Sequence, residues 1–165
     1  MEVKKNKYVV YTALFGNYDD LLAPAISDEC DFVCFTDDPN LKSDVWEIIV
    51  VESYMPANMM NRLYKIRPHV YLSDYQASIY LDSNIEIQKD PIGLFEKYLA
   101  NSEFIAIKHV ERNCIYSEAL SCMASRKTEC KLTFKQFYFY ASEGYPANNG
   151  LFENRVLIRS HNSEK

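Results

Sequence analysis

The stretch Ser78-Ile-Tyr-Leu-Asp-Ser-Asn-Ile-Glu-Ile87 joins an apolar run typical of a buried strand to two oxygen-bearing side chains, Asp82 and Asn84. In an extended segment residues i and i+2 share a face, so both side chains could reach one cation. A carboxylate and an amide carbonyl are hard ligands that suit Mg²⁺ or Mn²⁺, with phosphate oxygens as the remaining ligands. The pattern is therefore typical of a nucleotide-sugar site at the end of a strand.

The same three residues, 82–84, also suit a turn. Asp, Ser and Asn side chains form hydrogen bonds with nearby backbone groups, which makes them good turn residues. On these three residues alone the turn is the favoured interpretation. The case for a metal site depends on what the rest of the chain places beside them.

Length and composition predict one globular domain over residues 1–165. Hydrophobic residues make up 48% and charged residues 25%, as in ordinary soluble proteins. A net charge of −5 without a long Lys/Arg run argues against nucleic acid or a polybasic membrane anchor as partner. A small or neutral partner is expected, and the oligomeric state is not indicated.

Cysteine usage and the N-terminus predict a cytoplasmic location. The five cysteines show no CxxC or clustered Cys/His spacing, which argues against a disulfide framework and against a zinc site. The apolar run after the N-terminal residues 1–7 is too short for a signal sequence or a membrane span. We expect reduced, mostly buried thiols.

Hydrophobic periodicity predicts strands that alternate with helices. Pro56 is placed to open the first helix, and Pro68 is expected to kink or end it near Arg67. The predicted strands are residues 7–12, 32–35, 46–51, 78–81, 104–108 and 155–158, and the predicted helices begin at residue 57 or cover residues 91–100, 114–126 and 131–142.

This alternation predicts a GT-A-like (Rossmann-like) α/β fold, with a mostly parallel central sheet and helices on both faces. Ligands of such sheets bind beyond the carboxyl ends of the strands. The residues expected at that edge are Thr12, Thr36, Asp82, Lys108 and His161.

A polar stripe follows the helix that opens after Pro56. Its members, spaced for one helical face and opposite the apolar residues Met59, Leu63 and Ile66, are Asn58, Arg62, Lys65 and His69. A solvated face is the simpler interpretation. Because this helix leads into the strand before Asp82, Arg62 and Lys65 could instead bind a diphosphate, Arg through its planar fork and Lys as a point charge.

Two histidines are further candidates. His161 follows the last predicted strand, and its imidazole would complete a metal set with Asp82 and Asn84 and favour Mn²⁺. His109 lies with Lys108 and Arg112 in a charged loop after a strand, where substrate contacts concentrate.

Several enzyme classes lack their motifs. The chain has four glycines and no Gly-x-Gly-x-x-Gly or Walker loop, which argues against dinucleotide and P-loop chemistry. It has no Gly-x-Ser-x-Gly elbow of a serine hydrolase, and no cysteine stands out as a protease nucleophile.

Six segments in order along the chain resemble the glycosyltransferase-like domain family of bacterial polysaccharide proteins and of plant hexosyltransferases of mucilage synthesis, formerly a domain of unknown function. They are Tyr11-Thr-Ala-Leu-Phe-Gly-Asn-Tyr-Asp-Asp20, Asp31-Phe-Val-Cys-Phe-Thr-Asp-Asp38, Arg62-Leu-Tyr-Lys-Ile-Arg-Pro-His69, Ile79-Tyr-Leu-Asp-Ser-Asn84, Arg112-Asn-Cys-Ile-Tyr-Ser-Glu-Ala119 and Arg159-Ser-His-Asn162.

The resemblance implies a fold similar to glycogenin-like enzymes, a donor such as a UDP-sugar, a hydroxyl or glycan acceptor, a divalent metal and retention of anomeric configuration. By position, it implies a nucleotide pocket lined by Thr12, Ala13, Leu14, Phe15 and Tyr18, with Thr36 and Asp37 near the base or ribose. It implies metal ligands at Asp82, Asn84 and His161, with catalysis carried by Asp82, Arg62 and Lys65. Sugar and acceptor contacts would come from Lys108, His109, Arg112, Glu118, Asn149 and Gly150.

Two departures from the family pattern keep other functions open. Asn84 stands where a second carboxylate is expected, which would reduce the metal affinity. The family usually continues beyond Lys165 to an Arg-Asp-Gln segment, so the resemblance implies a domain that is truncated at its C-terminus, on the acceptor side. The alternatives are a non-catalytic nucleotide-sugar-binding module, a lipid amide hydrolase such as the ceramidase activity linked to a plant member, and a purely structural α/β domain.

Overall fold

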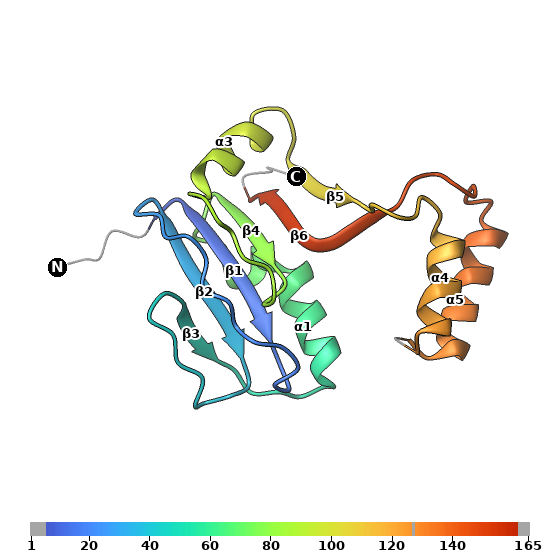
Figure 1. Cartoon of the computed structure of the whole chain (residues 1–165), viewed down its shortest axis with the longest axis horizontal. Coiled ribbons are helices and arrows are strands. Elements are labelled where there is room, and N and C mark those ends of the chain that lie inside the picture. The colour runs from blue at the N-terminus through green and yellow to red at the C-terminus, as the bar shows by residue number, and fades with distance from the viewer. Residues whose placement is uncertain (1–5, 127, 162–165) are drawn as a thin grey trace. The chain divides into compact units, whose positions relative to one another are not determined.

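A six-stranded sheet with the strand order β3-β2-β1-β4-β6-β5 is the framework of the protein (Figure 1). The computed structural model describes residues 6–126 and 128–161. The strands are β1 (Tyr8–Leu14), β2 (Cys30–Thr36), β3 (Glu47–Val50), β4 (Ala77–Leu81), β5 (Phe104–Lys108) and β6 (Phe152–Ser160). The helices are α1 (Ala57–Ile66), α2 (Pro68–Tyr71), α3 (Ile92–Leu99), α4 (Ile115–Ala124) and α5 (Cys130–Ser142).

The predicted α/β architecture is confirmed. The central strand β1 pairs in parallel with β2 and with β4, and β2 pairs in parallel with β3, whereas β6 is antiparallel to β4. In β1, six of the seven residues are buried, as expected for a parallel strand covered on both faces.

Two apolar cores cover the two faces of the sheet. On one face, alternate residues of β1 such as Tyr11 pack with Met60 and Tyr64 of α1. On the other face, Val10 and Ile79 pack with Phe95 of α3. Helices therefore cover both faces, as the alternation of strands and helices predicted.

The buried face of α1 differs from the one that the sequence predicted. Met60 and Tyr64 are buried, whereas Met59 is 47% exposed and Ile66 is 61% exposed. The helix is therefore rotated so that Met60 and Tyr64, rather than Met59 and Ile66, face the core. This rotation also carries Lys65 toward the sheet, where its side chain is only 15% exposed.

Pro68 ends α1 as predicted, but the chain does not leave the helical conformation for long. Helix α1 stops at Ile66, and Pro68 occupies the first turn of the short helix α2, where its missing N–H costs nothing. The separate helix α2 was not predicted from the sequence.

The described chain divides into two compact units, one formed by residues 1–106 and 155–165 and the other by residues 107–154. The expectation of a single domain stays a prediction. The cysteines are unpaired, with three buried, one half-buried and one exposed. No helix in the described part of the chain is long and apolar enough to cross a lipid bilayer.

Candidate functional site

A pocket of about 380 Å³ lies in the unit of residues 107–154, and a larger one of about 600 Å³ lies at the carboxyl ends of β1 and β4. The chain runs from β1 to β2 on one side and later returns to β4 on the other, so this edge is the switch point where α/β sheets bind ligands. The larger pocket is lined by Ala13, Leu14, Phe15, Gly16, Tyr18, Asp19, Ala57, Asn58, Asn61, Arg62, Lys65, Asp82 and Ser83. We call it the switch-point pocket.

The loop after β1 forms one wall of this pocket, and its backbone needs glycine. Gly16 has a φ of +70°, and Asn17 has a φ of +50°. Asp37, which follows β2, accepts the Gly16 N–H with Oδ1 at 3.0 Å. Asp37 therefore holds the loop in place, whereas the sequence placed it near a base or ribose.

Lys65 and Asp82 form an ion pair within the switch-point pocket. Lys65 Nζ donates to Asp82 Oδ1 at 2.9 Å, and the Tyr80 hydroxyl donates to the same oxygen at 2.9 Å. Burial and the neighbouring carboxylate raise the pKa of Tyr80 far above its usual range, so the phenol remains a donor. The Asp82 carboxylate is thus oriented from two sides, and its side chain is still 35% exposed.

The end of α1 is fixed to the sheet through the carbonyl of Lys65. Tyr11 Oη donates to this carbonyl at 3.0 Å, and Arg159 Nη1 from β6 donates to it at 2.8 Å and to the Ile66 carbonyl at 3.2 Å. A guanidinium at the last turn satisfies helix carbonyls that have no intrahelical partner. The hydrogen bonds to the Lys65 carbonyl therefore fix the backbone from which the Lys65 side chain extends.

Asp82 and Asn84 do not share the face of a strand. Strand β4 ends at Leu81, and the Ile85 N–H donates to the Asp82 carbonyl at 2.9 Å, which closes a turn over residues 82–85. Asp82 and Ser83 line the switch-point pocket, whereas Asn84 is exposed and is not among its lining residues. The turn predicted as the alternative is present. Of the two predicted metal ligands in it, only Asp82 lines the pocket.

His161 lies at the opposite end of β4 from Asp82. Because β6 is antiparallel to β4, Ser160 pairs with Ala77, and His161 Nε2 lies 2.8 Å from Ser78 Oγ. Ser78 and Asp82 are four residues apart, or about 13 Å along a strand. His161 Nδ1 lies 3.1 Å from the Leu72 carbonyl, so both ring nitrogens have protein partners. The structure does not bring this histidine to the predicted metal set.

The environment of His161 predicts a pH dependence of stability. Burial lowers its pKa below the usual 6.5, although hydrogen bonds to the backbone of Leu72 and Tyr75 oppose this shift. As the pH falls below about 6.5, His161 is protonated in the unfolded chain but stays neutral in the native state. The free energy of unfolding therefore decreases. Urea unfolding at pH 7.5 and pH 5.0 should show a larger loss for the wild type than for His161→Gln. Equal losses in both proteins would contradict this.

The two threonines predicted at the nucleotide have structural surroundings. Thr12 is completely buried in β1, does not line the switch-point pocket, and its Oγ1 has no hydrogen-bond partner among the described residues. Thr36 is buried at the end of β2, where its Oγ1 accepts the Asp38 N–H at 3.1 Å. The predicted nucleotide contacts that do line the pocket are Ala13 and Leu14 at the end of β1 and Phe15 and Tyr18 in the loop after it.

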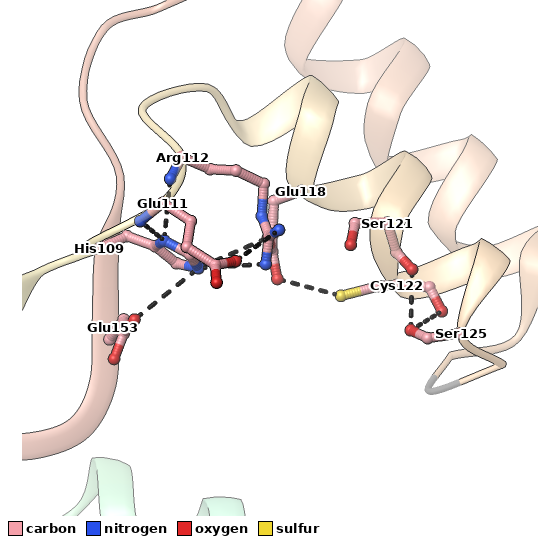
Figure 2. A network of polar contacts seen from close by, with 8 residues as sticks. All are labelled: His109, Glu111, Arg112, Glu118, Ser121, Cys122, Ser125 and Glu153. Atoms are coloured by element: carbon pink, nitrogen blue, oxygen red, sulfur yellow. Dashed lines mark hydrogen bonds and ion pairs between the residues drawn. The ribbon is translucent and has the colours of Figure 1, made fainter.

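The predicted sugar and acceptor residues all lie in the unit of residues 107–154. Figure 2 shows a polar network in this unit around His109. His109 Nδ1 accepts the N–H groups of Glu111 and Arg112 at 3.1 Å each, and Arg112 Nη2 lies 3.3 Å from Nε2. Nε2 faces Glu118 at 3.7 Å and Glu153 at 3.8 Å.

Glu118 contacts three other members of this network. Its carboxylate accepts Arg112 Nε on one oxygen and Cys122 Sγ at 3.2 Å on the other. Burial raises the pKa of Glu118, but the hydrogen bonds from Cys122 and Arg112 outweigh it and hold the pKa below its usual range. Glu118 is thus an ionised hydrogen-bond acceptor.

The remaining predicted acceptor residues have less defined surroundings. Gly150, with a φ of +90°, donates its N–H to the Asn113 carbonyl at 2.9 Å, and this bond closes the loop back onto the start of α4. Asn149 and Lys108 are exposed. The structure brings His109, Arg112 and Glu118 together and leaves Asn149 and Lys108 outside their network.

The lining of the switch-point pocket fits a divalent cation held by one carboxylate together with a bound phosphate. Within residues 6–126 and 128–161, no three His, Cys, Asp or Glu side chains are grouped so that they could hold a metal ion. Mg²⁺ is, however, commonly bound through one or two carboxylates plus substrate phosphates and water. Asp82 fits that mode, because its carboxylate is oriented, partly exposed and inside the pocket.

Several residues of the site were not predicted from the sequence. Asn61 of α1 donates from Nδ2 to the Ala13 carbonyl and lines the pocket with Asp19 and Ser83. Asn61 lies three residues after Asn58 on the polar stripe, so helical spacing alone could have found it. Tyr80 and Arg159 contact Asp82 and the end of α1, and only the three-dimensional pairing reveals them.

Comparisons with known proteins found one matching protein family and one similar plant protein. A protein-family model described as TOD1/MUCI70, glycosyltransferase-like domain, matches residues 1–163. The chain is 26% identical to a protein of Arabidopsis thaliana named probable hexosyltransferase MUCI70, over an alignment of 183 residues that covers 93% of the chain. That alignment covers 32% of the plant protein, so the chain spans about a third of its relative's length. No solved structure matches the chain significantly.

Proposed function

The chain belongs to the TOD1/MUCI70 glycosyltransferase-like domain family, and on this basis we propose that it transfers a hexosyl group from a nucleotide-sugar donor to a hydroxyl group of an acceptor. The donor is a UDP-sugar and the acceptor is a glycan. We further propose a GT-A-type domain, a cytoplasmic location and retention of anomeric configuration. NMR of the product anomer would test the retention.

The position of the switch-point pocket is the observation that carries this proposal. Its cationic residues, Arg62 and Lys65, come from α1, and its carboxylate, Asp82, comes directly after β4. A nucleotide diphosphate needs such cationic groups, because negative charge grows on it as the glycosidic bond breaks. Tyr18, whose side chain is 86% exposed, offers a ring face for the base.

Lys65 would bind the diphosphate directly, and Asp82 would bind it through a metal ion. The Lys65 ammonium lies 4.6 Å from the centre of the Tyr80 ring and 2.9 Å from Asp82, so it is held near the pocket floor rather than free in solvent. Asp82 would hold Mn²⁺ or Mg²⁺ jointly with phosphate oxygens. When bound, this cation supplies positive charge that stabilises the leaving diphosphate.

Removing the Lys65 charge should weaken UDP binding. Lys65→Met keeps the length of the side chain but loses a charge-assisted hydrogen bond and leaves Asp82 unpaired beside the diphosphate. We expect an affinity lower by about tenfold or more in calorimetric titrations of UDP in the presence of Mn²⁺. Lys97→Met on α3 is the matched control, because Lys97 lies over Tyr98 outside the pocket, and its affinity should equal that of the wild type.

Other outcomes would select other functions. If the unmodified chain bound neither UDP nor any UDP-sugar, the donor site would be wrong. Binding of UDP-sugars without transfer to any glycan would favour a non-catalytic binding module. Cleavage of a ceramide in the absence of sugar nucleotides would favour the lipid amide hydrolase.

A further inference from the structure

The pocket of about 380 Å³ in the unit of residues 107–154 is bounded by α4, α5 and the chain from Tyr145 to Leu151. All of its lining residues belong to this unit, so it is a site of its own. Its size falls within the range of about 300–1,000 Å³ that is usual for small-molecule sites. Such sites combine apolar walls with a few fixed polar groups.

Aromatic rings form much of the wall. Tyr116 of α4 meets Phe137 of α5 edge to face, with ring centres 4.8 Å apart, and Tyr140 lies 5.8 Å from Tyr145. The Tyr116 hydroxyl donates to the Tyr145 carbonyl at 2.6 Å, which ties α4 to the loop beyond α5. No residue of either helix is fully buried, so these rings border the pocket instead of a closed helix interface.

Glu118 brings a fixed anion to the same wall. As Figure 2 shows, its carboxylate is held between Arg112 and Cys122, with the His109 ring beside it. An ionised carboxylate has about four lone-pair positions, and these two hydrogen bonds use two of them. The remaining positions can accept hydroxyl groups of a ligand.

The charge of the wall limits the kind of ligand. Among the described residues that line the pocket, Glu118 alone carries a formal charge, while Thr133 and Gln136 add neutral polar groups. A phosphate or carboxylate ligand would meet the Glu118 carboxylate and no cation in the lining, because Arg112, which forms an ion pair with Glu118, is not among the lining residues. An acyl chain would fill the apolar part but would strip water from Glu118 without replacing its hydrogen bonds, which is costly.

We propose that this pocket binds a neutral glycosyl residue of the acceptor, with sugar C–H faces stacked on the aromatic rings and hydroxyl groups donating to Glu118. A sugar ring offers both surfaces that the wall requires, an apolar face and a rim of hydroxyl donors. The assignment of this ligand as the acceptor rests on the proposed glycosyl transfer. The binding of a neutral sugar does not.

Saturation-transfer difference NMR on the full chain can test this with methyl glycosides of glucose, galactose, mannose and rhamnose as probes. At least one neutral glycoside should bind, and galacturonic acid should bind more weakly than methyl galactoside. Tyr140→Ala removes a ring of the wall and should weaken glycoside binding by about tenfold. Tyr138→Ala is the matched control on the same helix, because Tyr138 is 70% exposed and does not line the pocket.

A second variant keeps the test decisive if Tyr140→Ala fails to fold. Glu118→Gln preserves size but loses the ionised acceptor, and glycoside binding should again fall about tenfold. Equal glycoside binding in Glu118→Gln and the wild type, preferential binding of galacturonic acid or of octanoate, or no glycoside binding at all would each overturn the proposal. UDP titrations of the same proteins report separately on the donor site, so failure of one site is distinguishable from failure of the other.

Discussion

Replacing Asp82 with alanine should abolish the contribution of Mn²⁺ to UDP binding while leaving metal-free binding in place. Asp82 carries the carboxylate that Tyr80 and Lys65 orient into the switch-point pocket. Without it, a cation at the diphosphate loses its protein ligand, and the affinity gained from Mn²⁺, about tenfold or more in the wild type, disappears. Lys65, released from its ion pair, remains available to the diphosphate.

Asp19→Ala is the matched control for this experiment. Asp19 is the other carboxylate in the pocket lining, and it comes from the loop after β1 rather than from the end of β4. UDP titrations by calorimetry, each with Mn²⁺ and with EDTA, should show a metal-dependent gain in the wild type and in Asp19→Ala. If Asp82→Ala keeps that gain, Asp82 is not the metal ligand.

Local sequence patterns were sufficient for the order and type of most elements. Runs such as residues 78–81 and 104–108 are mostly apolar and are bounded by polar or turn-forming residues. Each run therefore indicates a strand, whatever its position in the sheet. The loop after β1 could also be predicted from its Gly-Asn turn residues, whereas its place in a pocket was implied by the family resemblance. These features depend on residues close together in the chain.

The direction of the last strand could not be predicted in this way. An apolar run has the same sequence pattern in a parallel strand and in an antiparallel strand. The pattern of residues 155–158 therefore does not give the direction of β6 in the sheet. Because β6 runs antiparallel to β4, His161 lies beside Ser78 rather than at the pocket edge. The rotation of α1 could not be predicted for a similar reason. Met59 and Met60 are both apolar, and only the contact with the sheet determines that Met60 is the buried one.

The two interpretations of residues 82–84 turned out to be compatible. The turn after β4 is present, and it places Asp82 in the lining of the pocket, whereas Asn84 is exposed and is not a lining residue. A turn directly after a central parallel strand is where α/β proteins place ligand-binding side chains. A shared face of Asp82 and Asn84 is therefore not required for Asp82 to contact a diphosphate.

Alanine at Gly16 and alanine at Gly93 should change stability in opposite directions. A Cβ at Gly16 would lie 2.9 Å from the Ala57 Cβ, and its φ of +70° is unfavourable for residues with a side chain. Strain and overpacking together predict a loss of about 2–4 kcal/mol in the free energy of unfolding. At Gly93, in α3, a Cβ meets no atom within 4 Å, so Gly93→Ala should gain about 0.5–1 kcal/mol through helix propensity.

The same pair of variants connects stability to donor binding. Ala57 begins α1, so relief of the contact at Gly16 must move either the loop after β1 or the start of the helix that carries Arg62 and Lys65. Both line the switch-point pocket, and UDP affinity should therefore fall in Gly16→Ala but not in Gly93→Ala. Urea unfolding and UDP calorimetry on the two proteins measure both effects. A Gly16→Ala protein with wild-type stability and UDP affinity would show that the close approach of this loop to α1 is not what shapes the pocket.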